Sequence, residues 1–391
     1  MQTSMKRTLE ALGSLKLAVV GMVLLMLLVG ACTLAQVRLG IYGAVAVYIR
    51  TFLVWVRVPG TALSVPVFPG GGFVGLLLIV NMTASLVTRW SAGRLKPGLA
   101  LTHIGVILLL AGEFQTAFRA HESSLSIEVG QTLDYTEATR RTELAIEEGK
   151  APAAHGTKAE ATPAGKPLAT ISERDLARGG ELALPGLPVS LKVLRFLRNG
   201  HLVMQKEAAA GAIVVTAGSG RKLTVVELPA ATSDDEPETP VAYVEAVAGG
   251  KSLGVWLVSP VLGPQVLEAG GRKLALSMHP ERVWMPFTLT LKHFSHDVYP
   301  GTDIPRNFSS LVRLVDAERH EDRDVLIWMN HPLRYRGLTF YQASYGKGDT
   351  LSVLQVVRNP GWILPYLSCL IVTVGMAWHF LLRLAAARRD P

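Results

Sequence analysis

Four stretches of the chain are long and apolar enough to cross a lipid bilayer, and no other feature limits the fold as strongly. A spanning helix needs about 20 mostly apolar residues, because a helix satisfies its own backbone hydrogen bonds across a hydrocarbon core of roughly 30 Å. The four stretches cover residues 17–36, 71–88, 98–118 and 362–384. Only 18% of the 391 residues are charged, whereas about 25% are charged in a typical soluble protein. The sequence therefore predicts four transmembrane α-helices.

The charged residues predict which parts of the chain face the cytoplasm. The formal charge is +8, but residues 119–360 carry 27 basic and 28 acidic side chains, so the basic surplus flanks the apolar stretches. Cytoplasmic flanks of transmembrane helices are rich in Lys and Arg. With the N-terminus in the cytoplasm, the inner flanks hold Lys6, Arg7, Lys16, Arg89, Arg94, Lys96, Arg383, Arg388 and Arg389, and the outer flanks hold only Arg38, Arg50 and Arg57. We therefore expect both termini in the cytoplasm, residues 119–360 outside it, and contact with lipid rather than with nucleic acid.

A fifth apolar segment, residues 41–58, has two interpretations. Its arginines and aromatic residues suit a helix that lies in the outer membrane interface. The alternative is a fifth span, but a fifth span would invert the topology after it and oppose the distribution of positive charge. We therefore expect an interfacial helix here, within a first region of three spans that ends near residue 118.

The region between the third and fourth spans has the pattern of β-strands. Apolar and polar residues alternate with a period of two in segments such as 124–129, 189–194 and 311–315, which is typical of half-buried strands. The fold class that follows is a large, mainly antiparallel, sandwich-like β domain over residues 119–360, between helices three and four. Residues 149–166 and 230–240 are poor in large apolar side chains, so we expect flexible loops there.

Motifs for catalysis, disulfides and metal binding are scarce, and we predict no catalytic residue. Cys32 and Cys369 both lie in apolar stretches, and the chain has no CxxCH motif for covalent haem attachment. Residues 29–32 resemble a lipoprotein processing site at Cys32, with an ordinary helix end as the alternative. His293 and His296 have a metal-like spacing, but residues three apart on a strand point to opposite faces, so surface histidines are the simpler interpretation.

Ionisable residues inside predicted spans are the most informative side chains, because burying a charge in a bilayer is costly and usually marks a pathway, a pair or a ligand. His103 lies five residues into the third span, and a neutral imidazole at that depth can ligate haem iron. The alternative is a histidine that only packs against a neighbouring helix. His379 lies at a similar depth, but its closeness to Arg383 favours an interfacial side chain. Glu113 lies near the outer end of its span, where it can reach the headgroups.

Several segments together resemble the ResB (CcsB-type) family of system II cytochrome c biogenesis. Residues 31–36 resemble the exit from the family's first helix, with Cys for Gly and Ala for Pro, and residues 101–110 resemble the helix that carries its transmembrane histidine. Residues 65–71 and Asn81 match the second helix of a subset, and residues 359–361 match the entry to the last. The most specific match includes Pro300, Gly301, Pro305, Ser309, Asn330, Pro332, Tyr335, Gly337, Tyr341, Gln342 and Tyr345. We call these eleven the signature residues and expect a mainly structural role for them, because their turns and strand aromatics suit a packed hairpin; the alternative is contact with a partner. We recognise no family motif in residues 131–285.

The resemblance implies a subunit of a cytochrome c maturation complex in a bacterial-type inner membrane, with haem b as its transient substrate. The expected partners are a CcsA (ResC) type membrane protein, apocytochrome c and thiol-reducing proteins. The tryptophan-rich haem-binding loop of the CcsA type is missing here, so the chain is expected to be an accessory, non-catalytic subunit of a haem lyase complex. His103 would be an axial ligand of the iron, and the second ligand would lie on the partner, with His379 as the alternative. The competing function is a membrane-anchored structural or sensing module whose outer β domain binds a ligand or a subunit.

Overall fold

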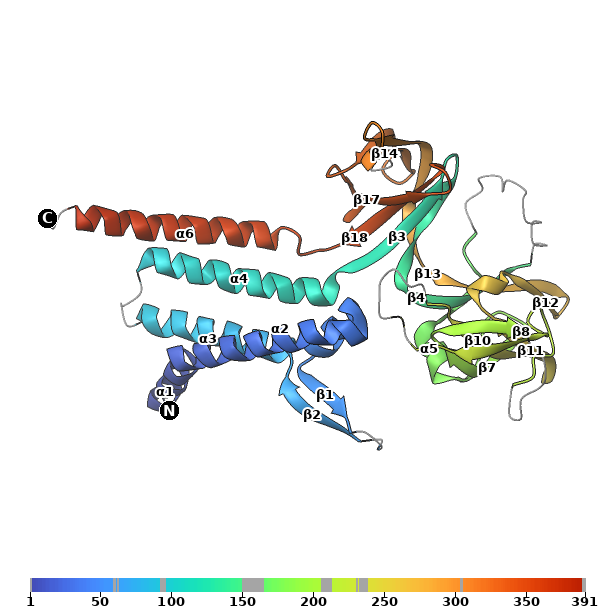
Figure 1. Ribbon diagram of the computed structural model, residues 1–391, viewed down its shortest axis with the longest axis horizontal. Coiled ribbons are helices and arrows are strands. Elements are labelled where there is room, and N and C mark those ends of the chain that lie inside the picture. The colour runs from blue at the N-terminus through green and yellow to red at the C-terminus, as the bar shows by residue number, and fades with distance from the viewer. Residues whose placement is uncertain are drawn as a thin grey trace. The chain divides into compact units, whose positions relative to one another are not determined.

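The chain forms two compact units. The computed structural model describes residues 2–58, 61, 63–91, 96–149, 165–204, 213–229, 231, 238–302 and 305–388. One unit, called the helical unit, contains the chain up to Ala120 and from Asn359 onward, and the other, called the β unit, lies between His121 and Arg358 (Figure 1).

The helical unit contains the membrane-type helices. Among the described residues, four helical stretches are long and apolar enough to cross a membrane, which confirms the predicted four-helix class. The helices are α1 (Gln2–Leu12), α2 (Leu15–Ala44), α3 (Gly71–Ser91), α4 (Pro97–Arg119) and α6 (Leu364–Ala387). Helix α2 extends beyond the predicted 17–36 at both ends, contains Cys32, and is kinked at Gly40, whose φ of 67° is not helical.

The segment predicted as one interfacial helix, residues 41–58, is helical only in its first half. A π-helical turn, Val45–Ile49, follows α2, and the chain then forms a two-stranded antiparallel hairpin of β1 (Leu53–Arg57) and β2 (Ser64–Pro69). The helix prediction for the second half is therefore wrong. The run Leu-Val-Trp-Val at 53–56 has β-branched and aromatic side chains that favour a strand. Pro66 and Pro69 are tolerated in β2 because both strands of a two-stranded sheet are edge strands.

Helices α4 and α6 pack at glycines. A Cβ atom on Gly98 would lie 2.7 Å from the carbonyl oxygen of Gly375, and one on Gly375 would lie 2.8 Å from the backbone nitrogen of Thr102. A Cβ on Gly105 would lie 2.6 Å from a methyl group of Val372. Small residues let helix backbones approach closely where the hydrophobic effect gives no drive toward association. The glycines therefore determine how close these two helices lie.

The β unit is built around one large antiparallel sheet, as the predicted class requires. Its strand order is β15-β14-β13-β4-β3-β18-β17-β16, and an isolated bridge from Trp328 to His331 links its two ends, so the sheet is a nearly closed barrel. The strands are β3 (His121–Glu128), β4 (Thr132–Glu148), β13 (Arg272–Val298), β14 (Pro305–Asp316), β15 (Glu321–Trp328), β16 (Leu333–Tyr335), β17 (Leu338–Gly346) and β18 (Leu351–Arg358).

Smaller elements extend this sheet. Strand β5 (Ala169–Ser172) pairs with β4, and β12 (Gln265–Ala269) pairs with β13. A second sheet has the order β11-β10-β7-β6, and β8 and β9 form a separate hairpin. The bounds are α5 (Glu173–Arg178), β6 (Gly180–Leu182), β7 (Ser190–Leu197), β8 (Gly200–Met204), β9 (Leu223–Glu227), β10 (Val241–Ala248), β11 (Lys251–Val258) and a 3-10 turn at Pro260–Leu262.

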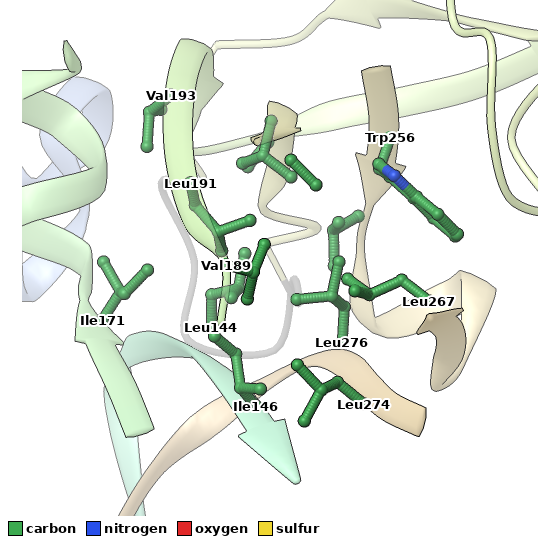
Figure 2. Packing of buried hydrophobic residues seen from close by; sticks show 14 of the residues in the cluster. Leu144, Ile146, Ile171, Val189, Leu191, Val193, Trp256, Leu267, Leu274 and Leu276 are labelled. Carbon is green, nitrogen blue, oxygen red and sulfur yellow. The ribbon is translucent and has the colours of Figure 1, made fainter. Parts of the chain in front are cut away.

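Two apolar cores lie along the long strands β4 and β13. The first, called the barrel core, includes Phe287, Leu289 and Phe340. The second, called the distal core, includes Leu144 and Ile146 of β4, which face residues of β13 and β7 (Figure 2). Alternation along each strand produces both cores, because every second side chain points inward. The predicted loops at 149–166 and 230–240 lie largely outside the described residues.

The glycine packing of α4 and α6 leads to a first prediction. We expect Gly375→Ala to lower the stability of the protein by about 1–3 kcal/mol, because the new methyl group meets backbone atoms that cannot move aside. Gly30→Ala is the matched control, since a Cβ atom at Gly30 meets nothing within 4 Å and Ala favours a helix over Gly by about 1 kcal/mol. Thermal unfolding in detergent measures both. A Gly375→Ala midpoint at or above that of Gly30→Ala would contradict the packing argument.

Candidate functional site

The imidazole of His103 has a defined orientation in α4. Its Nδ1 atom lies 2.8 Å from the carbonyl oxygen of Leu99, one turn earlier. A carbonyl oxygen can only accept a hydrogen bond, so Nδ1 carries the proton and donates it. In the neutral ring the other nitrogen, Nε2, then keeps its lone pair. His103 is therefore held in the tautomer that can ligate a metal through Nε2.

His103 lines a cavity of about 230 Å³ within the helical unit. The cavity walls come from the corner between α1 and α2, from α3 and from α4: Gly13, Ser14, Leu15, Ala18, Asn81, Met82, Ser85, Arg89 and His103. Gly13 allows the corner to approach α3, since a Cβ atom there would lie 2.6 Å from the backbone nitrogen of Ser85. The cavity thus combines one imidazole, one guanidinium and several small polar groups in a mostly apolar unit.

Three polar residues of α3 face this cavity at helical spacing. Asn81, Ser85 and Arg89 are four residues apart, which places them on one face of the helix. Asn81 is buried, and its Nδ2 donates to the carbonyl oxygens of Leu12 at 2.6 Å and Ser14 at 3.0 Å. These bonds satisfy two carbonyls at the break between α1 and α2. The cavity roles of Ser85 and Arg89 were not predicted, although the spacing of these residues with Asn81 within an apolar stretch indicates a shared helix face.

The other ionisable residues of the predicted spans lie elsewhere in the helical unit. His379 is half-buried on α6, where its backbone lies against Gly98 and its ring contacts Phe380 at 5.8 Å. His379 is not among the described residues that line the cavity of His103. Glu113 is exposed on α4. At this cavity, among the described residues, the structure therefore does not bring His103 and His379 together.

The signature residues lie in and around the barrel of the β unit, and two of them, Tyr335 and Gln342, belong to hydrogen-bond networks. In the first, called the Asp316 network, the carboxylate of Asp316 is fully buried. It accepts hydrogen bonds from Arg336 at 2.5 and 2.8 Å and from the hydroxyl of Tyr335 at 2.7 Å. Burial alone would raise the pKa of Asp316, but the hydrogen bonds from Arg336 and Tyr335 outweigh burial and lower this pKa to about 2. Asp316 ends β14, so the network ties β14 to the turn after β16.

The second network connects three strands of the barrel. Ser310 of β14 donates to Oε1 of Gln342 at 2.6 Å, and its oxygen lies 2.7 Å from that of the buried Ser352. The Nε2 of Gln342 also donates to Ser352 at 3.1 Å. Nearby, the ring of Tyr345 contacts Phe294 and Phe308. Gln342 and Tyr345 therefore stabilise the barrel interior.

The remaining signature residues shape turns and strand ends. Asn330 and Gly337 have positive φ angles of 64° and 78°, which Asn and Gly adopt most readily. The other members lie in turns, next to strands or within them: Pro300 and Gly301 in the turn after β13, Pro305 at the start of β14, Ser309 opposite Trp328, Pro332 before β16, and the exposed Tyr341 in β17. These positions supply backbone geometry and packing.

The Asp316 network leads to a prediction about pH. The folded-state pKa of Asp316 is depressed below its ordinary value near 4, so its contribution to stability is complete above pH 4 and is lost as the pH falls toward 2. We expect the thermal midpoint of Asp316→Asn to fall below that of the wild type at pH 6 and the two midpoints to converge toward pH 2. Asp324→Asn, which alters an exposed pair with Lys292, is the control. A constant difference between wild type and Asp316→Asn from pH 6 to 2 would count against the network.

Comparison with known proteins agrees with the signature region. A model of the ResB-like family matches residues 268–353, which run from β12 through β18. Protein NrfI of Wolinella succinogenes is 33% identical over 106 residues, 27% of this chain and 12% of the relative. Cytochrome c biogenesis protein CcsB of a Picosynechococcus species is 38% identical over 80 residues, 20% of this chain and 17% of the relative. The matches thus span less than a fifth of either relative's length. The chain carries a ResB-like segment, and the resemblance to this family predicted from its sequence is confirmed.

Proposed function

We propose that this chain is a ResB-like subunit that helps to deliver haem across the membrane and attach it to apocytochrome c, together with a CcsA (ResC) type partner. The observation that carries the proposal is His103, an imidazole with a directed Nε2 lone pair in a cavity of the helical unit, in a chain with a ResB-like segment. Similarity to a relative named as a cytochrome c biogenesis protein supports the proposal.

The residues around His103 suit haem as a substrate. Histidines that bind metals commonly donate their second ring N–H to a backbone carbonyl, as His103 does to Leu99. Arg89 adds a positive charge to the same cavity, which suits a haem carboxylate. His103 would hold the iron, and Asn81 would keep the α1–α2 corner in place beside it.

The size of the cavity supports a shared site. At about 230 Å³ it is smaller than the roughly 300–1,000 Å³ of pockets that enclose a drug-sized ligand, so it can receive one face or edge of a porphyrin only. The rest of the ring would contact the partner, which would also supply the second iron ligand. His379 is the alternative ligand, and it would have to reach the iron from outside this cavity. We assign no catalytic residue to this chain.

Replacement of His103 tests the proposal. We expect the His103→Ala complex to assemble with its partner, to lose most of its haem, and to fail in cytochrome c maturation, because the iron loses one axial ligand. Added imidazole should restore part of both, since it can occupy the space of the lost ring. His379→Ala is the matched control and should retain haem. Absorption spectra of co-purified complexes and a maturation assay in cells provide the measurements.

Two results would contradict this proposal. A His103→Ala complex with the haem content and spectrum of the wild type would make His103 a packing residue. Loss of haem in His379→Ala with no loss in His103→Ala would reverse the assignment of the ligand.

We propose further that both termini face the cytoplasm and that the β unit is extracytoplasmic, as the nine-to-three distribution of flanking cations favours. A reporter enzyme that is active only outside the cytoplasm should work when inserted in the turn at Gly249 and Gly250, between β10 and β11. The same reporter fused after residue 391 should be inactive. The opposite pattern would overturn this topology.

A further inference from the structure

The β unit contains a second cavity, of about 860 Å³, at the edge of the barrel core. Strands β3, β4 and β13 and the turns around Arg319 and Arg336 supply its walls. Its volume lies within the roughly 300–1,000 Å³ of pockets that bind small molecules and cofactors. The cavity lies wholly within the β unit and is separate from the site of His103.

Positive charge predominates among the residues that line this cavity. Four arginines line it, Arg141, Arg319, Arg336 and Arg358, against one carboxylate, that of Glu122. Arg141 pairs with Glu281, and Arg336 pairs with Asp316. Among the described residues, no ion pair joins the guanidinium of Arg319 or Arg358 to a carboxylate, although the backbone N–H of Arg319 donates to Asp316. Two guanidinium groups are thus available at one cavity, and a guanidinium binds a carboxylate through two parallel hydrogen bonds.

The same cavity has an apolar, aromatic wall. Trp284 and Phe287 line it, with Met285 and Leu338 beside them. Phe287 is fixed by edge contacts with Tyr335 and Phe340, and the guanidinium of Arg319 lies 5.7 Å from the ring of Tyr335. Aromatic side chains bind flat apolar ligands by stacking. The occupant that suits both features is an anion with a flat apolar body.

A histidine side chain further limits the class of ligand that suits this cavity. The exposed imidazole of His121 also lines the cavity, and imidazole is a ligand for haem iron. A phospholipid headgroup would use the arginines but neither the aromatic wall nor the imidazole. A porphyrin dicarboxylate that carries iron would use all three.

We propose that this cavity is a second haem-binding site, in which Arg319 and Arg358 hold the carboxylates, Trp284 and Phe287 contact the ring, and His121 ligates the iron. This inference rests on the proposed function for its choice of haem as the ligand, but it concerns a different site. Haem received at His103 would then have a second protein site in the β unit.

The test uses the purified full-length chain with His103→Ala as the background, so that the first site does not contribute. The probe is metal-free protoporphyrin, and the signal is the change in the absorption spectrum of the porphyrin when it binds. We expect Arg319→Gln together with Arg358→Gln to weaken binding by roughly tenfold or more, because two charge-assisted contacts are lost. Protoporphyrin dimethyl ester, which lacks the free carboxylates, should bind the chain that retains both arginines with a similarly lowered affinity. Arg174→Gln, an exposed arginine on α5, is the matched control and should leave binding unchanged.

Ferric haem tests the role of His121. We expect His121→Ala to weaken the binding of ferric haem and to change the absorption spectrum of the bound haem. The binding of metal-free protoporphyrin should be unaffected. Equal binding of the acid and the ester, unchanged binding in the double arginine variant, or an equal effect of His121→Ala on both porphyrins would overturn the proposal. Binding of phosphatidylglycerol vesicles that is lost in the double arginine variant, together with no binding of porphyrin, would assign the cavity to a lipid headgroup instead. Because the background lacks His103, a negative result in this test does not contradict the proposed function of His103. Conversely, a negative result for His103 does not contradict the proposed site in the β unit.

Discussion

The structure depends on the pairing of two chain segments that are far apart in the sequence. The first segment is α4 with β3, and the second is β18 with α6. Helix α4 leads into β3 through the single residue Ala120, and β18 leads into α6 through a short turn at residues 359–363. The helices pack at glycines, and the two strands pair along their full length from His121 with Arg358 to Glu128 with Leu351. The same two segments therefore meet twice, once through close backbone contact and once through a hydrogen-bonded ladder. In the sequence, every other element of the β unit lies between β3 and β18.

The signature residues can be explained by their contribution to the fold, without a catalytic role. A buried aspartate is costly unless it is paired and hydrogen-bonded, and Arg336 and Tyr335 together satisfy both oxygens of Asp316. Gln342 similarly satisfies two buried serines. These groups fix the part of the barrel where β15 and β16, the two ends of the strand order, approach each other. Yet Arg336 and Gly337 also line the large cavity of the β unit, so a structural role and a place beside a ligand are compatible there.

Much of this architecture could be predicted from sequence because it depends on local pattern. Long apolar runs determine the helices, and alternation determines strands such as β3 and β14. The hairpin of β1 and β2 was missed because its apolar residues were interpreted by composition, whereas their branched and aromatic shapes favoured strands. The partner of Arg336 could not be predicted, since Asp316 lies 20 residues away and only the fold brings them together. The same holds for His103, whose place in a span was evident but whose bond to Leu99 and whose neighbours on α3 were not.

The barrel core and the distal core share the two longest strands of the β unit. Strand β4 spans 17 residues and β13 spans 27, and each contributes side chains to both the barrel core and the distal core. If the distal core opened, β13 would lose part of its ladder with β4 and all of its ladder with β12, and the barrel would lose the support of both strands. Such sharing couples the local unfolding of one region to that of the other. The β unit is thus expected to melt in a single cooperative transition, although its apolar residues form separate clusters.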